Sequence, residues 1–183
     1  CNHCEGNEKD GVPPCVKICP EYPGKRMTFK TADGKKIRYR GGATHKRPDG
    51  LVLIDTDLCI GCGKCIDACP YGVRSFNPFV KAGKDPTKQA ADKCDMCKER
   101  VANGIDPSCV NTCQGRARIF GDLNDPNSEV AKLVKEHNLA KNVLLPEEGT
   151  DPHVFYIDPD NMLKDLYTKR TKGKLDHYVD VIP

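Results

Sequence analysis

The amino-acid sequence predicts an α+β fold in which metal centres replace much of the usual hydrophobic core. Twelve cysteines occur among 183 residues, whereas only 38% of the residues are hydrophobic and none is tryptophan. The cysteines fall into three groups of similar spacing, with an alternating pattern between the first two groups and helical patterns after the third. Metal sites can stabilise such a chain, because their ligands bind tightly only once the chain is folded.

Each cysteine group begins with a C-x2-C pair and ends with a C-x3-C pair. The gap between the two pairs is ten residues in the first group, two in the second and eleven in the third. A proline follows the last cysteine of the first two groups. The groups form an internal repeat, and they are Cys1, Cys4, Cys15 and Cys19; Cys59, Cys62, Cys65 and Cys69; and Cys94, Cys97, Cys109 and Cys113.

Three kinds of chemistry can use these cysteines. Disulfides are a poor general solution, because pairs separated by two or three residues close very short loops. Structural zinc takes two short cysteine pairs some distance apart, and the third group approaches that spacing. The second group does not fit zinc, since three ligands from one short loop cannot easily surround a single tetrahedral ion. A [4Fe–4S] cluster offers several iron corners to one curled loop and fits this spacing.

The second group, with Pro70, matches the bacterial ferredoxin pattern C-x2-C-x2-C-x3-C-P, whose fourth cysteine binds the other cluster of a pair. Gly61 and Gly63 would let the backbone approach the cluster closely. If the first two groups pair by this rule, one cluster is held by Cys1, Cys4, Cys15 and Cys69, and the other by Cys59, Cys62, Cys65 and Cys19. This pairing predicts a bacterial-ferredoxin-like unit with pseudo-two-fold symmetry at residues 1–80.

The third group lies in residues 81–124 and has no partner group in the sequence. Either its four cysteines hold one cluster alone, which gives three clusters, or a fourth motif pairs with it, which gives four.

Other segments show patterns of secondary structure. Residues 27–39 alternate around the turn sequence TADG and predict a β-hairpin, and a turn at 47–50 leads into a strand over 51–54. A short helix is expected to end at Gly104. An amphipathic helix is expected between Asp125, as its cap, and Asn138. Its apolar face would consist of Val130, Leu133, Val134 and His137. Residues 125–183 continue with a second helix start at Asp158 and an extended tail that would become ordered on a partner.

Positive charge is concentrated in residues 25–49, within the insert at about 21–50. This segment has nine lysines and arginines against two aspartates, a formal charge of +7, so the rest of a chain of +3 carries −4. A solvated hairpin is the preferred interpretation, and a basic arm that docks on an acidic partner is the alternative. Nucleic acid is not expected as a partner, because the segment lacks a series of aromatic residues for base stacking. No apolar run reaches the ~18 residues that span a bilayer.

Six segments resemble one known protein family: CNHC, PPCVKICP, CIGCGKCIDACPYGVRSFNP, KCDMCKERVANGIDPSCVNTC, RIFGDLNDPNSEVAKL and LLPEEGTDPHVFYI. The family is the four-cluster iron–sulfur subunits of molybdenum enzymes of the dimethyl sulfoxide reductase type. The sequence is most similar to the branch that serves polysulfide, thiosulfate, tetrathionate and arsenate reductases. That family has four cysteine motifs, of which the first pairs with the last, so we expect a further N-terminal motif as the partner of the third group. The resemblance then implies that Cys94, Cys97 and Cys109 hold a cluster with a ligand from that motif and that Cys113 serves a further cluster. Gln114 replaces the usual proline, and the insert at 21–47 is longer than usual.

The resemblance implies an electron-transfer subunit without catalytic residues. Such subunits pass electrons between a catalytic subunit, with molybdenum or tungsten on a pterin cofactor, and a quinone-binding membrane subunit or a soluble carrier. It also implies an extracytoplasmic position, associated with the membrane through partners, although the sequence is compatible with the cytoplasm. The alternatives are a free polyferredoxin and a zinc-binding interaction module.

Three further residues lie near the predicted ligands. Lys64 and Arg74 could raise the reduction potential of a cluster through their charge, although solvated surface is the preferred interpretation of both. His3 lies between two ligands and could donate a hydrogen bond to a cluster, but a packing or surface role is more common. The other histidines, His45, His137, His153 and His177, are scattered and do not suggest a histidine metal site.

Overall fold

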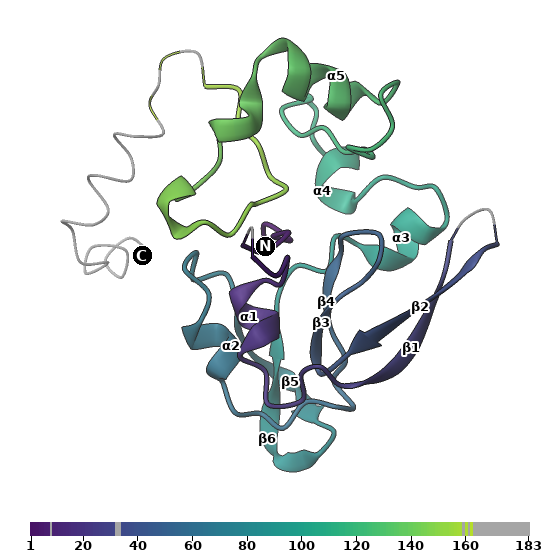
Figure 1. The fold of residues 1–183 in the computed structure, drawn as a ribbon, viewed down its shortest axis with the longest axis vertical. Coiled ribbons are helices and arrows are strands. Elements are labelled where there is room, and N and C mark those ends of the chain that lie inside the picture. Colours follow the sequence, from purple (N-terminus) through teal and green to yellow (C-terminus); the bar gives the residue numbers. More distant parts are fainter. Residues whose placement is uncertain (8, 32–33, 159, 161, 163–183) are drawn as a thin grey trace.

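Three two-stranded antiparallel sheets and several short helices make up the computed structural model, which describes residues 1–7, 9–31, 34–158, 160 and 162. Figure 1 shows α1 (Pro14–Lys17) and α2 (Lys64–Asp67) side by side near the middle of the molecule. Sheet strands lie below and to the right of them in this view, and the later helices lie above. The short hairpins and few helices agree with the predicted α+β class.

The first sheet is the hairpin of β1 (Lys25–Lys30) and β2 (Lys36–Gly41), as the alternation predicts. Its exposure alternates along both strands. One face is half-buried and contacts β3 (Thr44–Lys46), while the other face is exposed. The half-buried face consists of Met27, Phe29, Ile37 and Tyr39.

The second sheet pairs β3 with β4 (Val52–Ile54). The predicted strand after the 47–50 turn appears as β4, and the turn is closed by a hydrogen bond from the Gly50 N–H to the carbonyl of Arg47 at 2.9 Å. Strand β3 is too short to show a period in the sequence.

The third sheet is a hairpin of β5 (Ser75–Ala82) and β6 (Asp85–Asp92), which the sequence did not predict. Its strands contain Pro78 and Pro86 and many charged residues, which weaken the strand pattern. The pairing register shifts between Phe76 and Ala82, so the ladder is irregular where the first proline lies. This irregularity explains why no clean alternation is visible in the sequence.

Helix α5 (Glu129–Glu136) begins later than predicted. Asp125 does not cap it, because its side chain accepts a hydrogen bond from the N–H of Asn127 at 2.9 Å and forms a preceding turn. Ser128 is the cap, and its hydroxyl accepts from the N–H of Ala131 at 3.1 Å. The hydroxyl of Ser128, which adjoins the first helical turn, therefore caps the helix in place of the expected carboxylate of Asp125.

The rest of the α5 prediction holds in part. Val130, Leu133 and Val134 are half-buried, but His137 is exposed and lies at the end of the helix. Asn138 adopts a left-handed conformation with φ of 50°, as expected of a residue that ends a helix. The shorter helix α3 (Lys98–Ala102) likewise ends before Gly104, whose φ is 69°.

The apolar core is small and contains cysteine. Cys19, Ala43, Cys59, Ala82 and Ala90 are buried together, and Leu58 and Val80 pack against them. Two of these five residues are predicted cluster ligands. The cysteine loops therefore form part of the core itself, as expected for a protein with so few large apolar residues.

Residues 150–153 fold back onto the N-terminal loop. The N–H groups of Glu5 and Gly6 donate to the carbonyls of Asp151 and Thr150 at 2.8 and 3.0 Å. Two short 3-10 helices, η1 (Leu139–Lys141) and η2 (Pro146–Glu148), lead into this segment. Apart from a few residues near Asp158, the second predicted helix and the predicted tail lie outside the described residues. No helix within the described ranges is long and apolar enough to cross a membrane.

Candidate iron–sulfur centres

The C-x2-C pairs of all three cysteine groups share one backbone turn. The residue before the second cysteine has a positive φ in each case, which is 44° for His3, 65° for Gly61 and 61° for Met96. This left-handed turn curls the backbone so that its N–H groups point inward. The N–H of His3 lies 3.5 Å from the Sγ of Cys1, and that of Gly61 lies 3.4 Å from the Sγ of Cys59.

The C-x3-C pairs share a second local structure, a single helical turn. Helices α1, α2 and α4 (Ser108–Asn111) each have the first cysteine of the pair as their second residue. The second cysteine follows two residues after the helix and its N–H bonds back into it, at 3.2 Å for Cys19, 3.1 Å for Cys69 and 3.0 Å for Cys113. The third group therefore has the same local structure as the first two, although its central gap is eleven residues.

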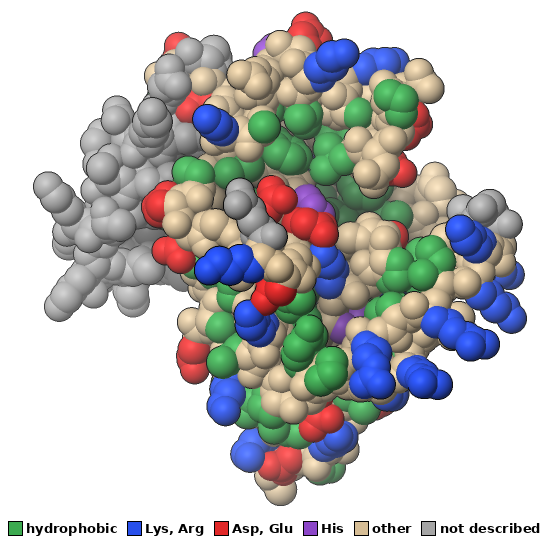
Figure 2. Space-filling model, viewed as in Figure 1, with side chains coloured by type: hydrophobic (Ala, Val, Ile, Leu, Met, Phe, Trp, Pro, Cys, Tyr) green, Lys and Arg blue, Asp and Glu red, His purple; other side chains and the backbone are tan. Residues whose placement is uncertain are grey.

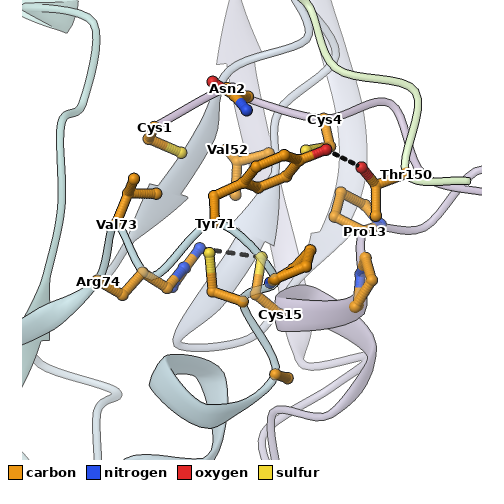
Figure 3. A pocket seen from close by; sticks show the side chains of 14 residues that line it. Cys1, Asn2, Cys4, Pro13, Cys15, Val52, Tyr71, Val73, Arg74 and Thr150 are labelled. Carbon is orange, nitrogen blue, oxygen red and sulfur yellow. Dashed lines mark hydrogen bonds between the residues drawn. The ribbon is translucent and has the colours of Figure 1, made fainter. Parts of the chain in front are cut away.

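Contact between α1 and α2 brings the first two groups together around two cavities. The lining of the first cavity includes four cysteines and is shown in Figure 3. Three of them come from the first group and one from the second. They are Cys1, Cys4, Cys15 and Cys69.

The second cavity has the reciprocal composition, with three cysteines of the second group and one of the first. Its cysteines are Cys59, Cys62, Cys65 and Cys19. Cys62 is exposed, whereas the other three are buried. Each cavity thus gathers the four cysteines that the predicted pairing assigns to one cluster.

The thiols surround a space rather than a point. Among the described residues, no three His, Cys, Asp or Glu side chains lie close enough to hold a single metal ion. Four thiols around a cavity of this kind fit the donor set of a [4Fe–4S] cluster. Neither of the two cavities contains a cysteine of the third group.

Gly61 and Gly63 both adopt conformations that favour glycine. Both have positive φ values, of 65° and 76°. A Cβ atom on Gly61 would lie 2.6 Å from the Cβ of Lys88, closer than real side chains come. The space beside Lys88 therefore requires glycine at this turn, whereas His3 and Met96 adopt the same conformation with a side chain.

Arg74 is not solvated surface, so the preferred sequence interpretation of this residue was wrong. It is only 5% exposed, and its Nη2 donates to the Sγ of Cys15 at 3.1 Å (Figure 3). Its Nη1 lies 3.5 Å from the hydroxyl of Thr44. No carboxylate among the described residues forms an ion pair with Arg74. Burial raises the pKa of the Cys15 thiol, and the charge of Arg74 opposes that rise. Lys64 is exposed, as expected.

His3 is a buried packing residue that joins two cysteine groups. It is 1% exposed, and its Nδ1 accepts a hydrogen bond from the N–H of Val52 at 3.0 Å. The proton must therefore sit on Nε2, which donates to the carbonyl of Cys94 at 3.0 Å. Burial lowers the pKa of His3 to about 3, so the ring is neutral. Lys93 donates to the same carbonyl at 2.8 Å, and sequence reasoning gave no sign of this contact.

Two side chains close the first cavity from outside the cysteine motifs. The hydroxyls of Tyr71 and Thr150 lie 2.5 Å apart, and both residues line the cavity. Burial raises the pKa of Tyr71 to about 12 and also raises that of the Cys4 thiol. Thr150 comes from the distant segment that folds back on the N-terminal loop, so the sequence held no signal for it.

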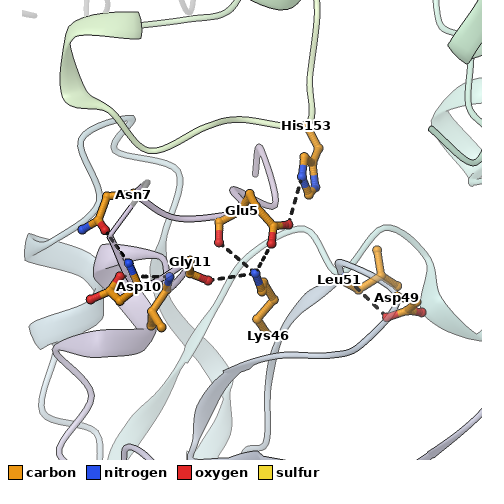
Figure 4. A network of polar contacts seen from close by, with 9 residues as sticks. Glu5, Asn7, Asp10, Gly11, Lys46, Asp49, Leu51 and His153 are labelled. Atoms are coloured by element: carbon orange, nitrogen blue, oxygen red, sulfur yellow. Dashed lines mark hydrogen bonds and ion pairs between the residues drawn. The ribbon is translucent and has the colours of Figure 1, made fainter. Parts of the chain in front are cut away.

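Lys46 fastens the long loop between Cys4 and Cys15 (Figure 4). Its ammonium donates to the carbonyls of Glu5 and Gly11 at 2.9 and 2.8 Å, and it forms an ion pair with the Glu5 carboxylate. Glu5 begins the loop, and Gly11 lies four residues before Cys15. One side chain therefore ties together two separate points of the ten-residue loop that leads from Cys4 to Cys15.

We expect Lys46→Met to lower the stability of the folded protein by about 1–3 kcal/mol, because two half-buried carbonyls and a carboxylate lose their partner. Thermal unfolding, followed by the visible absorbance of the bound clusters, measures this effect. The control is Lys17→Met, since Lys17 pairs with Asp10 on the surface of the same loop and is exposed. Such pairs contribute ~0–1 kcal/mol. Equal effects of the two substitutions would contradict the role of Lys46 as a clamp.

Comparisons with known proteins agree with this geometry. Residues 1–123 match the family model described as a 4Fe-4S dicluster domain. The sequence is 39% identical to a tetrathionate reductase subunit of Salmonella typhimurium, over 88% of this protein and 51% of that subunit. It is 34% identical to the arsenate respiratory reductase iron-sulfur subunit of Shewanella sp., over 86% of this protein and 72% of that subunit.

A further relative is one of the polysulfide reductase chains of Wolinella succinogenes, with 34% identity over 86% of this protein and 64% of that relative. The sequence spans about half the length of several of these curated relatives, including the tetrathionate reductase subunit.

Proposed function

We propose, from the premise that this protein belongs to the family of 4Fe-4S dicluster domains, that it is the electron-transfer subunit of a respiratory oxidoreductase complex. It would hold [4Fe–4S] clusters and pass electrons without an active site of its own. The observation that carries this proposal is the composition of the two cavities, each lined by three cysteines of one motif and one of the other.

The residues that line the first cavity would have two different roles, as cluster ligands and as a hydrogen-bond donor to a ligand. Cys1, Cys4, Cys15 and Cys69 would be its ligands, and Arg74 would donate a hydrogen bond to one ligand sulfur. A [4Fe–4S] cluster supplies one-electron redox chemistry when bound, at a potential set by charge, hydrogen bonds and solvent exposure. The wall formed by Tyr71 and Thr150 would limit the access of water to this cluster. In the second cavity Cys59, Cys62, Cys65 and Cys19 would be the ligands.

The third group would add at least one cluster, for a total of three to four. Its local structure supports roles for Cys94, Cys97 and Cys109 like those of the first three cysteines in the other groups. In the cross-paired arrangement Cys113 would then serve a further cluster. A cysteine outside the three groups would complete the cluster held by Cys94, Cys97 and Cys109.

The partners are proposed from the relatives. Two of the most similar proteins are named as subunits of tetrathionate and arsenate respiratory reductases. We propose a large catalytic subunit with molybdenum or tungsten on a pterin, and a quinone-binding membrane subunit or a soluble carrier at the other end. The protein would then be associated with the membrane through these partners, on its extracytoplasmic side.

The experiment is metal and sulfide analysis of the anaerobically purified protein together with EPR of its reduced form. We expect iron and acid-labile sulfide in equal amounts and EPR signals of several interacting reduced clusters. Zinc without reducible clusters would reject the proposal. Isolation from the native source together with a large subunit would support the complex, whereas a stable monomer would favour a free polyferredoxin.

A further inference from the structure

We propose that the outer face of the β1–β2 hairpin is a docking surface for an acidic redox partner protein, which exchanges electrons through the second cluster site. This basic face carries five exposed cations and no acidic residue: Arg26, Lys30, Lys36, Arg38 and Arg40. Figure 2 shows lysine and arginine side chains gathered along the right side of the molecule, where Figure 1 places this hairpin.

The strand register makes this face electrostatically unfavourable in the isolated protein. Arg26 lies directly opposite Arg40, and Lys30 directly opposite Lys36. Directly opposed like charges destabilise an antiparallel pair. None of the five cations forms an ion pair with an acidic residue in the described part of the sequence. Carboxylates of a partner would relieve the repulsion and gain attraction at the same time.

The hairpin holds these charges at fixed positions. Its other face is half-buried, and the guanidinium of Arg47 stacks 4.5 Å from the centre of the Phe29 ring. At the base of the hairpin, Lys25 pairs with Asp55 at 3.7 Å. The first cation of β1 without an ion pair among the described residues is therefore Arg26. A hairpin anchored in this way presents a pattern of charge with defined spacing, which can match the acidic surface of a folded protein.

The base of the hairpin reaches the second cavity. Glu21, Ala43 and Thr44, which flank the two strands in sequence, line that cavity together with Cys19. Cys62 is the exposed cysteine of the set. A protein bound at the base of the basic face, over Arg26 and Arg40, would therefore lie beside the second cluster site. This step depends on the proposed function, because it needs a cluster in the cavity.

The chemistry of the face favours a protein over a membrane. Helices and segments that rest on membranes usually add aromatic or aliphatic anchors to their basic residues. Here the apolar and aromatic residues of both strands, including Met27 and Phe29, lie on the opposite, half-buried face. The outer face offers only cations and Thr28.

The test uses an acidic plant-type [2Fe–2S] ferredoxin as the probe. In stopped-flow mixing, one electron leaves the reduced ferredoxin and enters an oxidised cluster of this protein. The hairpin variant replaces Arg26, Lys30, Lys36 and Arg40 with glutamine. The control variant removes the same charge elsewhere, at the exposed residues Arg118, Lys132, Lys135 and Lys141. At low salt we expect the hairpin variant to react at least about tenfold more slowly, with a weaker dependence on salt. The control variant should react like the wild type.

Equal rates for the hairpin and control variants would overturn the proposal. So would a hairpin variant that loses binding only to phosphatidylglycerol vesicles, because the face would then be a membrane contact. Binding of the ferredoxin to the cluster-containing protein, measured by biolayer interferometry, checks the docking surface separately from electron transfer. Absent clusters would reject the proposed function, whereas full clusters with unchanged rates would reject only the docking surface.

Discussion

Replacing Cys69 with alanine is expected to remove the cluster of the first motif and to spare that of the second, although Cys69 belongs to the second motif. The reason is the position of its side chain, which lines the cavity of Cys1, Cys4 and Cys15. Iron and sulfide content should fall by about one cluster, and EPR should lose one set of signals. Because ligand binding contributes to folding free energy, thermal stability should fall as well.

The matched variant is Cys19→Ala, which should remove the other cluster. Resonance Raman or EPR signatures of the two variants should therefore be complementary. If Cys69→Ala instead eliminated the cluster held by Cys59, Cys62 and Cys65, each motif would close its own cluster. The cross-paired arrangement would then be wrong.

The second large effect is expected for Arg74→Met, which should lower the reduction potential of one cluster. Arg74 is buried, has no carboxylate partner among the described residues and donates to the Sγ of Cys15. A reduced cluster carries one more negative charge, so a nearby buried cation stabilises the reduced form more than the oxidised form. A differential effect of about 2 kcal/mol, which is modest for charges a few ångström apart, corresponds to about 90 mV for one electron. A redox titration followed by EPR measures it.

Two control variants separate charge from packing. Arg74→Lys keeps the charge and should recover part of the potential. Lys64→Met removes an exposed charge within the second cysteine motif. Because solvent and salt screen this charge, its effect on the reduction potential should be a small fraction of the effect of Arg74→Met. If Arg74→Met left every potential unchanged, the guanidinium would serve only to fill space.

The two cavities lie next to each other, which suits transfer of electrons between them. The Cys15 thiol of the first cavity is influenced by the charges of Cys4, Cys69 and Cys65. Cys65 lines the second cavity. The contact of α1 with α2 thus places the two cavities side by side, and each cavity includes one cysteine of the other motif.

The cysteine spacing identified the chemistry, whereas the family was identified from six segments, two of which follow the last cysteine. A [4Fe–4S] cluster needs several ligands from one short curled loop, and few other sites produce this pattern. The resemblance to iron–sulfur subunits of tetrathionate, arsenate and polysulfide reductases is confirmed by the relatives. The β1–β2 hairpin and the end of α5 at Asn138 were also predictable, because alternation and a left-handed asparagine act over a few residues.

Tertiary structure decided everything that depends on residues distant in sequence. The burial of Arg74 against Cys15, the clamp of Lys46 on its loop and the cover of Thr150 over the first cavity each join segments at least 35 positions apart. The irregular β5–β6 hairpin and the Ser128 cap were likewise not predictable from local sequence patterns, although they involve residues close together in sequence. Local sequence patterns report short-range conformational preference and ligand spacing. The burial of a side chain and its hydrogen-bond partners depend on which segments become neighbours in the folded protein. Local sequence patterns do not encode these neighbours.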